Sequence, residues 1–350
     1  MQRRNFLRNI ALASASVPLM SFDSFDSAEE ENELKITKPK ALKKGDTIGL
    51  ITPGSYISDE GLETAIDNVK SLGFKVKLSK NIRKERGYTA GSKEERVDDL
   101  HEMFADPEIK GIWAARGGYG CSGLLPLIDF DLIRKNPKVF IGYSDITVLH
   151  LAIFKKTGLV TFHGPVASST FTDYTRKYVE KMITSTEIPP KVYPCKENDT
   201  EALENEFFKP KVFKSGKAKG RLVGGNLSLI AALVGTEWEM ELSDKLIFIE
   251  DIGEAPYRID RMLIQVDQNK DLNDAKGLIF GVFDDAEKPE DELSLSLEQM
   301  FDDNTKDLEI PCAYGFSFGH IDNQFTLPLG IMARMNSDKR TIEFLESAVV

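Results

Sequence analysis

Cysteine and histidine are scarce in this sequence, which has three cysteines and four histidines among its 350 residues. The cysteines, Cys121, Cys195 and Cys312, are odd in number and include no CxxC spacing, so neither a disulfide framework nor a zinc knuckle is expected. The histidines form no HExxH pair, which argues against a metallohydrolase. We therefore expect neither a disulfide-stabilised protein nor a metal-dependent hydrolase.

A basic surplus and a long apolar run are also missing. The 45 lysines and arginines are outnumbered by 56 aspartates and glutamates, and the net charge of −11 argues against a nucleic-acid partner. The one apolar run near the start is too short to span a membrane, so no stable membrane insertion is expected. With 41% hydrophobic and 29% charged residues, the composition is that of a globular protein long enough for two domains.

The first residues are typical of an export signal. Arg3, Arg4 and Arg8 precede the modestly apolar stretch IALASASVPLM, and the paired arginines before Phe-Leu resemble the twin-arginine type. A basic terminus without a targeting role is the alternative. We predict the signal and the start of a spacer over residues 1–28, and a disordered acidic spacer over 29–41. The expected location is periplasmic, or cytoplasmic if the signal does not function.

Strand and helix patterns alternate between residues 42 and 185. The runs DTIGLI, KVKL, KGIWAA and KVFIGY are typical of strands, whereas SDEGLETAIDNVKSLG and SKEERVDDLHEMFADP each place apolar residues on one helical face. The second helical run begins with Ser92 and Glu95 in capping-box spacing. The alternation predicts an α/β domain with a mostly parallel sheet, and a ligand site beyond the carboxyl ends of its strands.

The second half of the chain is richer in predicted strands. Residues 186–219 contain four prolines and dense charges, which indicate a linker or a long crossing loop. From residue 220 to 345 we expect a second domain. It starts with a strand and a Gly-Gly turn in GRLVGGN, and continues through the strands KLIFIED, KGLIFGVFDD, PCAYGFSF, QFTLPLGIMARMN and RTIEFLE.

Three apolar, strand-like segments each end at a residue that a serine hydrolase needs. Ser144 follows KVFIGY, Glu250 ends KLIFIE, and His320 follows YGFSFG. A serine hydroxyl attacks a carbonyl only when a base takes its proton and a third group orients that base. The order serine, acid, histidine along the chain therefore suggests a catalytic triad.

Each of these residues also has a plainer interpretation. Ser144 lies before a helical run and could be a helix N-cap. It also lacks the full GxSxG elbow, because Ile146 stands in place of the second glycine. Glu250 could belong to a solvated acidic pair with Asp251, and His320 could be an ordinary loop histidine. In the catalytic interpretation, the amide of Asp145 lies at the helix start and would stabilise an oxyanion.

The run Gly118-Tyr-Gly120-Cys-Ser-Gly123 matches the GxGxxG spacing of dinucleotide sites. In that case, Asp145 would be placed to bind a ribose. The match is weak because only a short, proline-interrupted stretch follows the glycines, and because the run does not follow the first strand of the domain. We interpret it instead as a close-approach loop whose backbone amides face a substrate.

The segments TPGS, GIWAARGGYG, FIGYSD, GRLVGGNLSLI, FIEDIGEAPYRIDRML and GFSFGH together resemble the serine LD-carboxypeptidase family. This family contains the murein tetrapeptide carboxypeptidases and the microcin C immunity peptidases, and the resemblance runs from about Lys43 to Asn336. It implies a flavodoxin-like N-terminal domain joined to a smaller, β-rich swivelling domain, usually in a homodimer.

The resemblance assigns roles by position. The nucleophile falls on Ser144, the triad acid on Glu250 and the base on His320, with oxyanion donors at the amides of Gly118 and Asp145. The implied reaction is hydrolysis of the amide between an L-configured diamino acid centre and a terminal D-alanine of a murein stem peptide, through an acyl-enzyme. The resemblance also implies that no metal ion and no cofactor are needed. The export signal departs from the murein-recycling members, which act in the cytosol.

Further assignments are less constrained by the sequence. Arg116, beside the glycine loop, is a candidate contact for the substrate carboxylate, although it could equally pair with a structural acid. An immunity-type peptidase acting on aminoacyl-nucleotide conjugates would need a stacking aromatic, for which Tyr193, Phe207 and Phe208 are available. A non-catalytic protein that binds wall peptides is the third alternative.

Overall fold

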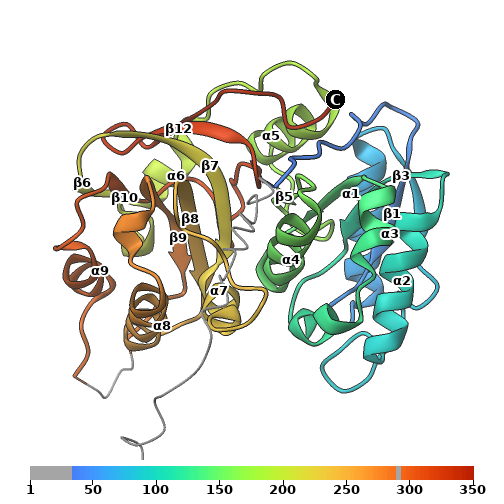
Figure 1. Ribbon diagram of the computed structural model, residues 1–350, viewed down its shortest axis with the longest axis horizontal. Coiled ribbons are helices and arrows are strands. Elements are labelled where there is room, and N and C mark those ends of the chain that lie inside the picture. The colour runs from blue at the N-terminus through green and yellow to red at the C-terminus, as the bar shows by residue number, and fades with distance from the viewer. Residues whose placement is uncertain (1–33, 289–292) are drawn as a thin grey trace, which may run out of the picture. The chain divides into compact units, whose positions relative to one another are not determined.

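The computed structural model of the protein describes residues 34–288 and 293–350 (Figure 1). Residues 34–350 form one compact unit. The predicted export signal, residues 1–28, and the first part of the predicted spacer, residues 29–33, lie outside the described residues. None of the described helices is both long enough and apolar enough to cross a membrane.

Strands and helices alternate in the described part of the first half, as the sequence predicts. The elements, with 3₁₀ helices labelled η, are β1 (Thr47–Ile51), α1 (Asp59–Ser71), β2 (Lys75–Leu78), α2 (Lys93–Ala105), β3 (Ile109–Ala114), η1 (Cys121–Leu127), α3 (Phe130–Lys135), β4 (Val139–Gly142), η2 (Ser144–Ile146), α4 (Thr147–Thr157), β5 (Phe162–His163) and α5 (Asp173–Thr184).

The first sheet has the strand order β2-β1-β3-β4-β5, with β11 (Leu327–Pro328) added beyond β5. The first five strands are mutually parallel, whereas β11 is antiparallel to β5. This is the order of flavodoxin-like folds, in which ligands bind beyond the carboxyl ends of the strands. The predicted α/β fold with a flavodoxin-like first sheet is therefore confirmed.

Local sequence explains these elements. All four residues of β4 are buried, as expected of a central parallel strand that is covered on both faces. The predicted capping box at the start of α2 is present, with the Ser92 hydroxyl bound to the Glu95 amide and the Glu95 carboxylate bound to the Ser92 amide. Helix α2 packs against β1 and β3.

The described part of the second half contains more strands than the first, also as expected. Its elements are α6 (Lys196–Glu201), η3 (Glu206–Phe208), β6 (Lys211–Lys214), β7 (Lys217–Asn226), α7 (Leu227–Leu233), β8 (Lys245–Ile252), α8 (Pro256–Asn269), η4 (Leu272–Asp274), β9 (Gly277–Asp284), α9 (Leu297–Thr305), β10 (Cys312–Tyr314), β11, β12 (Met332–Asn336) and β13 (Thr341–Phe344).

The second sheet has the order β13-β12-β7-β8-β9-β10-β6. Strands β7 to β10 are parallel, and antiparallel strands are added at both sides of them. The carboxyl ends of β7 and β8 therefore lie at the same edge of this sheet, where Asn226 pairs in register with Glu250.

The predicted Gly-Gly turn in GRLVGGN is wrong. Strand β7 continues through Gly224 and Gly225 to Asn226, and both glycines have positive φ, +153° and +147°. A Cβ at Gly224 would lie 1.8 Å from the Phe248 carbonyl oxygen, and one at Gly225 would lie 2.5 Å from Thr147. The glycines therefore allow close approach of β8 on one side and of the start of α4 on the other.

That close approach joins the two sheets at the site. The backbone amide of Asn226 donates to the Thr147 hydroxyl at 3.0 Å. Helix α4 and the preceding η2 also pack against β7, and α4 packs against α7. The turn that follows β4 is consequently fixed against the end of β7.

The segments expected to lack regular structure are partly ordered. Residues 186–219, predicted as a linker, include α6, η3 and the edge strand β6, which are too short to give a clear periodicity. In the predicted spacer, Thr37 forms a bridge with Leu159, and the amide of Ala41 donates to the Val350 carbonyl at 2.8 Å. The predicted disordered spacer therefore extends too far toward the folded domain, since Thr37 and Ala41 are already paired through their backbones. So short a paired run leaves no periodic pattern in the sequence.

Candidate functional site

Ser144 is separated from the end of β4 by Tyr143 alone and takes the first position of η2. Its φ is +64°, a left-handed value that costs a non-glycine residue roughly 1–3 kcal/mol and is concentrated at functional sites. The N-cap alternative is not supported, because η2 and α4 are preceded by Tyr143 and Ile146 at their cap positions, and neither cap has a side-chain hydrogen bond. A strained turn thus places the Ser144 hydroxyl at the edge of the sheet.

The glycine loop after β3 packs against this turn. A Cβ on Gly117 would lie 3.1 Å from Cβ of Ser144. Ser55 holds the loop at two points: its amide donates to the Gly117 carbonyl at 2.9 Å, and its hydroxyl accepts from the Tyr119 amide at 3.0 Å. Gly118, between them, has φ +90°, and a Cβ there would lie 2.3 Å from the Ser55 hydroxyl. Only glycine fits this position.

The Asp145 side chain holds the same loop from the other side. Its buried carboxylate accepts a hydrogen bond from the Cys121 amide at 2.8 Å. Burial raises the pKa of Asp145, and hydrogen bonds from Cys121 with the nearby Arg96 charge act in the opposite direction. The carboxylate is therefore occupied inside the protein, which does not support the dinucleotide interpretation. The predicted oxyanion donors, Gly118 and Asp145, flank Ser144, and that role stays a prediction.

Glu250 and His320 form a buried hydrogen-bonded pair. Glu250 lies near the end of β8 and is fully buried, and its Oε2 is 2.7 Å from Nδ1 of His320 in the loop after β10. Because an ionised carboxylate can only accept, Nδ1 of His320 carries the proton and donates. The solvated acidic pair is therefore wrong, and His320 is a loop histidine whose Nδ1 is paired with a buried carboxylate.

The two groups shift one another's pKa. Burial acts to raise the pKa of Glu250, but attraction to His320 and its hydrogen bond outweigh burial and hold the pKa below its ordinary value. Burial acts to lower the pKa of His320, and the Glu250 charge and hydrogen bond reverse this and raise it. Glu250 thus stabilises the protonated imidazole, as a triad acid does.

The structure brings His320 beside the residue that precedes Ser144. The rings of Tyr143 and His320 are 4.5 Å apart between centroids. Within the described part of the chain, Ser144 and His320 share no hydrogen bond. Catalytic hydrogen bonds are often long in unliganded enzymes and tighten with substrate.

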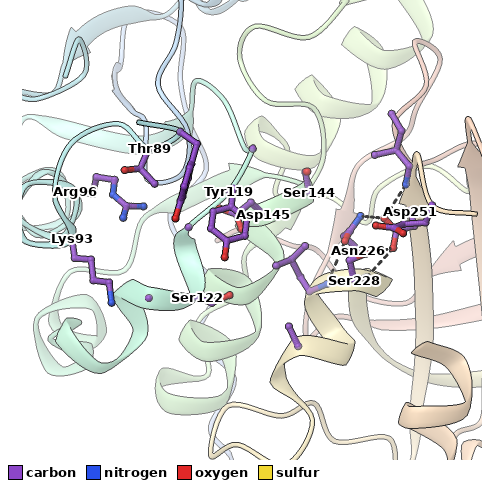
Figure 2. Close-up of a pocket in the computed structure, with 18 residues that line it drawn as sticks. Thr89, Lys93, Arg96, Tyr119, Ser122, Ser144, Asp145, Asn226, Ser228 and Asp251 are labelled. Atoms are coloured by element: carbon purple, nitrogen blue, oxygen red, sulfur yellow. Dashed lines mark hydrogen bonds between the residues drawn. The ribbon is translucent and has the colours of Figure 1, made fainter. Parts of the chain in front are cut away.

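A cavity of about 780 Å³ extends from Ser144 between the two sheets. Figure 2 shows Lys93 and Arg96 on one side of Ser144, and Asn226, Ser228 and Asp251 on the other. The first wall is therefore cationic and the second is acidic.

Arg96 and Lys93 differ in whether their charged groups are already bound within the protein. Arg96 is buried, and its guanidinium donates to the Pro53 carbonyl at 2.7 Å and to the Ser92 carbonyl at 3.3 Å. Lys93 is exposed and takes part in none of the ion pairs between described residues. Its terminal methylene lies over Gly123, where a Cβ would be 2.9 Å away. Of the two, Lys93 has its charge available to a ligand.

Arg116, the sequence candidate for the substrate carboxylate, is exposed. It donates to the Tyr56 carbonyl at 2.8 Å, and its guanidinium lies 5.9 Å from the centre of the Tyr56 ring. It is not among the described residues that line the cavity. The structure therefore places it outside the group formed by Ser144 and the cavity walls.

The aromatic residues considered for a nucleotide also lie elsewhere. Tyr193, Phe207 and Phe208 are absent from the lining of this cavity as the described residues form it. Tyr88 and Tyr119 do line it, with ring centroids 5.1 Å apart and with exposed fractions of 67% and 64%. Neither tyrosine directly follows an expected strand, so the sequence pattern gives no signal for this pair.

A network around Asp251 was also missed. The buried Asp251 carboxylate accepts from the Asn226 amide group at 2.9 Å, and from both the amide and the hydroxyl of Ser228 at 2.8 Å. Burial, together with the adjacent Glu250 charge, raises the pKa of Asp251 to about 6. The signal in the sequence is the doubled acid at the end of an apolar strand, for which a solvated acidic pair was the alternative interpretation.

Among residues 34–288 and 293–350, no group of three or more histidine, cysteine, aspartate or glutamate side chains is arranged to hold a metal ion. The three cysteines are buried and free.

Comparisons with known proteins find carboxypeptidases over most of the chain. Two family models match the chain: the LD-carboxypeptidase N-terminal domain over residues 48–164 and the LD-carboxypeptidase C-terminal domain over residues 219–335. A probable murein peptide carboxypeptidase from Bacillus subtilis is 44% identical over 305 residues, which cover 87% of this chain and 93% of that protein.

Two solved structures share the fold. An MccF-like protein from Bacillus anthracis has a TM-score of 0.78 and 33% identity, over 88% of this chain and 99% of its own. A muramoyltetrapeptide carboxypeptidase from Oxalobacter formigenes has a TM-score of 0.72 and 33% identity, over 85% of this chain and 97% of its own.

Proposed function

This chain belongs to the LD-carboxypeptidase family, and from that premise we propose that it is a serine enzyme that removes the terminal D-alanine of murein tetrapeptides. The bond cut joins the D-alanine to an L-configured diamino acid centre. The observation that carries the proposal is the buried Glu250–His320 hydrogen bond, with the His320 ring against the residue before the strained Ser144.

In the proposed mechanism, Ser144 is the nucleophile and His320 the base. Nε2 of His320 takes the hydroxyl proton as the Ser144 oxygen attacks the substrate carbonyl, and Glu250 stabilises the imidazolium through Nδ1. The imidazolium then protonates the leaving amine, D-alanine departs, and an acyl-enzyme remains. Water attacks that ester, gives a proton to His320, and restores the Ser144 hydroxyl.

The glycine loop would stabilise the tetrahedral intermediate. The amides of Gly118 and Asp145 lie on the two segments that meet at Ser144, and the loop is fixed by Ser55 and by the Asp145 carboxylate. Donors that are held in place before reaction cost no reorganisation when the oxyanion forms. The contacts between these segments support the oxyanion role of the two amides.

A carboxypeptidase also needs a cation for the free carboxylate of its substrate. Arg116 is the candidate from the sequence, and Lys93 is the candidate from the cavity. The position of Lys93 on the cavity wall, with no ion pair to any described residue, favours Lys93. The opposite, acidic wall, with Asp251 and Glu254, suits the free amino group of a diamino acid.

The reaction can be tested by mass spectrometry of a murein tetrapeptide incubated with the enzyme. We expect loss of one alanine with the wild type, and a rate lower by at least about 10³-fold with Ser144→Ala. The matched control is Ser58→Ala, because Ser58 is a true N-cap whose hydroxyl accepts from the Gly61 amide at 3.1 Å. That variant should lose stability but keep its rate.

Normal turnover by Ser144→Ala would contradict the assignment of the nucleophile. An inactive wild type would contradict the tetrapeptide substrate. If the inactive wild type is also not labelled by a serine-directed phosphonate, the non-catalytic wall-peptide binding protein is favoured instead.

A second candidate is an immunity-type peptidase that cleaves aminoacyl-nucleotide conjugates. The exposed Tyr88–Tyr119 pair at the cavity favours it, since aromatic faces stack on nucleobases, and the structural similarity to the MccF-like protein is in line with it. Hydrolysis of an aminoacyl sulfamoyl nucleoside, impaired about tenfold or more by Tyr119→Ala, would support this candidate. Activity on the tetrapeptide alone would exclude it.

Export by a twin-arginine-type signal and assembly as a homodimer complete the proposal. Fractionation of cells that express the full chain, with the wild type beside a variant in which Arg3 and Arg4 are both lysine, tests export. A periplasmic wild type and a retained variant are the expected results. Sedimentation of the purified protein tests the dimer, and a monomer at every concentration would contradict it.

A further inference from the structure

His163 is a buried histidine to which the proposed mechanism gives no role. It ends β5, is 1% exposed, and neither of its ring nitrogens has a hydrogen-bond partner in the described part of the protein. A neutral imidazole carries one N–H donor and one acceptor lone pair. A buried donor left unpaired destabilises a folded protein, so this ring is a costly choice for an apolar site.

Glu250, in turn, has a carboxylate oxygen that lacks a hydrogen-bond donor. Its Oε2 accepts from His320, whereas its Oε1 is buried and has no partner among the described residues. A buried, ionised carboxylate is stabilised by two or three hydrogen bonds rather than one. The nearby Asn226 side chain helps to lower the pKa of Glu250, but its amide group donates to Asp251 and leaves Oε1 of Glu250 without a hydrogen bond. Glu250 therefore has room for one more donor.

Packing places His163 against the proposed catalytic residues. Its ring is 5.3 Å from that of Phe248, which lies two residues before Glu250 on β8 and so faces the same side of the strand. Its ring is also 6.2 Å from Phe318, two residues before His320, and 6.2 Å from Tyr143, the residue before Ser144. His163 thus contacts the segment that carries each member of the proposed triad.

We propose that His163 is a positioning residue whose neutral imidazole N–H serves Oε1 of Glu250 as a hydrogen-bond donor through one buried water. This inference rests on the proposed function, because the Glu250–His320 pair that His163 positions is catalytic only under that proposal. With Oε1 held by His163, the carboxylate cannot rotate, and Oε2 stays on Nδ1 of His320. Nε2 of His320 is then directed toward Ser144.

The charges around His163 agree with a neutral donor. Burial lowers the pKa of His163 to about 4, with the Glu250 charge opposing this and His320 adding to it. Two further titratable groups near the ring also stay neutral: burial raises the pKa of Tyr143 to about 12 and lowers the pKa of His150 to about 3. Asp251 and Asp284 raise the pKa of His320 and have no comparable effect on His163. At neutral pH, His163 supplies a dipole and no charge.

Loss of that donor should change the pH dependence and not only the rate. Without it, the Glu250 charge is less well satisfied and holds the His320 proton more tightly. The acid limb of kcat/KM, on which His320 must lose its proton, therefore moves to higher pH.

The test is the pH profile of kcat/KM on a murein tetrapeptide for the full chain and its variants. We expect His163→Phe, which keeps the aromatic packing, to raise the apparent pKa of the acid limb by about half a unit or more and to lower the plateau about tenfold. His163→Gln or His163→Asn should restore the limb, because each retains an N–H donor. An unchanged limb in His163→Phe would overturn the proposal.

His150→Phe is the matched control. His150 is equally buried, and burial lowers its pKa to about 3, but its Nε2 pairs with the Gly142 carbonyl at 2.9 Å. Its loss should lower the melting temperature and leave the acid limb in place. A limb shifted equally by both variants would assign the effect to general loss of stability and would overturn the proposal.

A measurement on the wild type covers the case in which His163→Phe does not fold. With four histidines in the chain, ¹⁵N-labelled imidazoles can be resolved by NMR. We expect His163 to keep one slowly exchanging ring N–H across the titration, and its shift to follow protonation of His320. A charged or rapidly exchanging His163 ring would overturn the proposal even if the enzyme acts on another substrate, because this readout needs no turnover.

Discussion

The two sheets contribute to the candidate site in opposite ways. On the first sheet, Ser144 lies on a strained turn, open to the cavity and without a hydrogen bond to His320. On the second sheet, Glu250 and His320 are buried, paired and shifted in pKa. The proposed nucleophile is thus kept accessible by backbone strain, while the proposed base is prepared by burial and charge, and each sheet can be disturbed separately.

Removing the proposed triad acid should have the largest effect, because His320 then loses the carboxylate that orients it and stabilises its charge. We expect Glu250→Gln to lower kcat about 10³- to 10⁴-fold, since an amide can donate to Nδ1 and favour the wrong tautomer. Steady-state kinetics on a murein tetrapeptide measures it. Glu343→Gln is the control, because Glu343 is a carboxylate of the same sheet in an exposed ion pair with Arg334. Equal effects in the two variants would contradict the triad.

The same pair sets a pH dependence whose sign follows from the shifts. Because the pKa of His320 is raised above its ordinary value of 6.5, kcat/KM should fall as pH drops through that higher value. The stability from its pairing is complete below the ordinary value and is lost as pH rises through the folded one. In Glu250→Gln the residual acid limb should move to lower pH, and a limb that stays in place would contradict the pairing.

The glycine loop of the first wall should come next. Gly118→Ala places a Cβ 2.3 Å from the Ser55 hydroxyl and should lower kcat about 10²-fold by displacing the loop. Gly45→Ala is a close control, because Gly45 has the same φ of +90° and nothing within 4 Å of a built Cβ. Both variants carry the backbone cost, so comparison of their kcat values and melting temperatures isolates the loop.

A smaller effect is expected from the cationic edge of the first wall. We expect Lys93→Gln to raise KM about tenfold with little change in kcat, because a charge-assisted contact to the substrate carboxylate is lost. Arg116→Gln, on the outside of the cavity, should change KM less. The reverse order of the two KM values would restore Arg116 as the carboxylate contact.

The smallest effect concerns stability on the second wall. Because burial raises the pKa of Asp251 to about 6 from 3.8, its contribution is present at low pH and is lost as pH rises between these values. Asp251→Asn should remove a slope of about 1.4 kcal/mol per pH unit from the unfolding free energy in that range. Urea unfolding at several pH values measures it, and parallel curves for wild type and variant would contradict the shift.

The sequence predicts those candidate site residues that lie at the end of an apolar strand. The apolar runs before Ser144, Glu250 and His320 indicate the ends of three strands. The alternation of strands and helices indicates a parallel sheet, and ligands bind beyond the carboxyl ends of such strands. The contact between Glu250 and His320 was a hypothesis from role alone, and the 2.7 Å hydrogen bond confirms it.

What could not be predicted depends on contacts between distant backbones. Gly224 and Gly225 look like a turn in sequence, and only the approach of Phe248 and Thr147 shows why a strand needs them. Arg116 and Lys93 are both cations near the glycine loop, and the fold alone decides which one lines the cavity. His163 has no motif, because its position depends on three aromatic neighbours from three separate segments.

Strand β11 has a consequence for the order in which the protein matures. Leu327 pairs with His163 across about half of the chain, so the edge of the first sheet stays open until residue 328 has been synthesised. Pairings between such distant residues form late, because a long loop must close before they gain anything. A nascent chain can therefore form the Ser144 turn while the neighbouring edge of the first sheet, beside His163, is still uncovered. Covering of that edge by β11 should be among the last events in the folding of the first sheet.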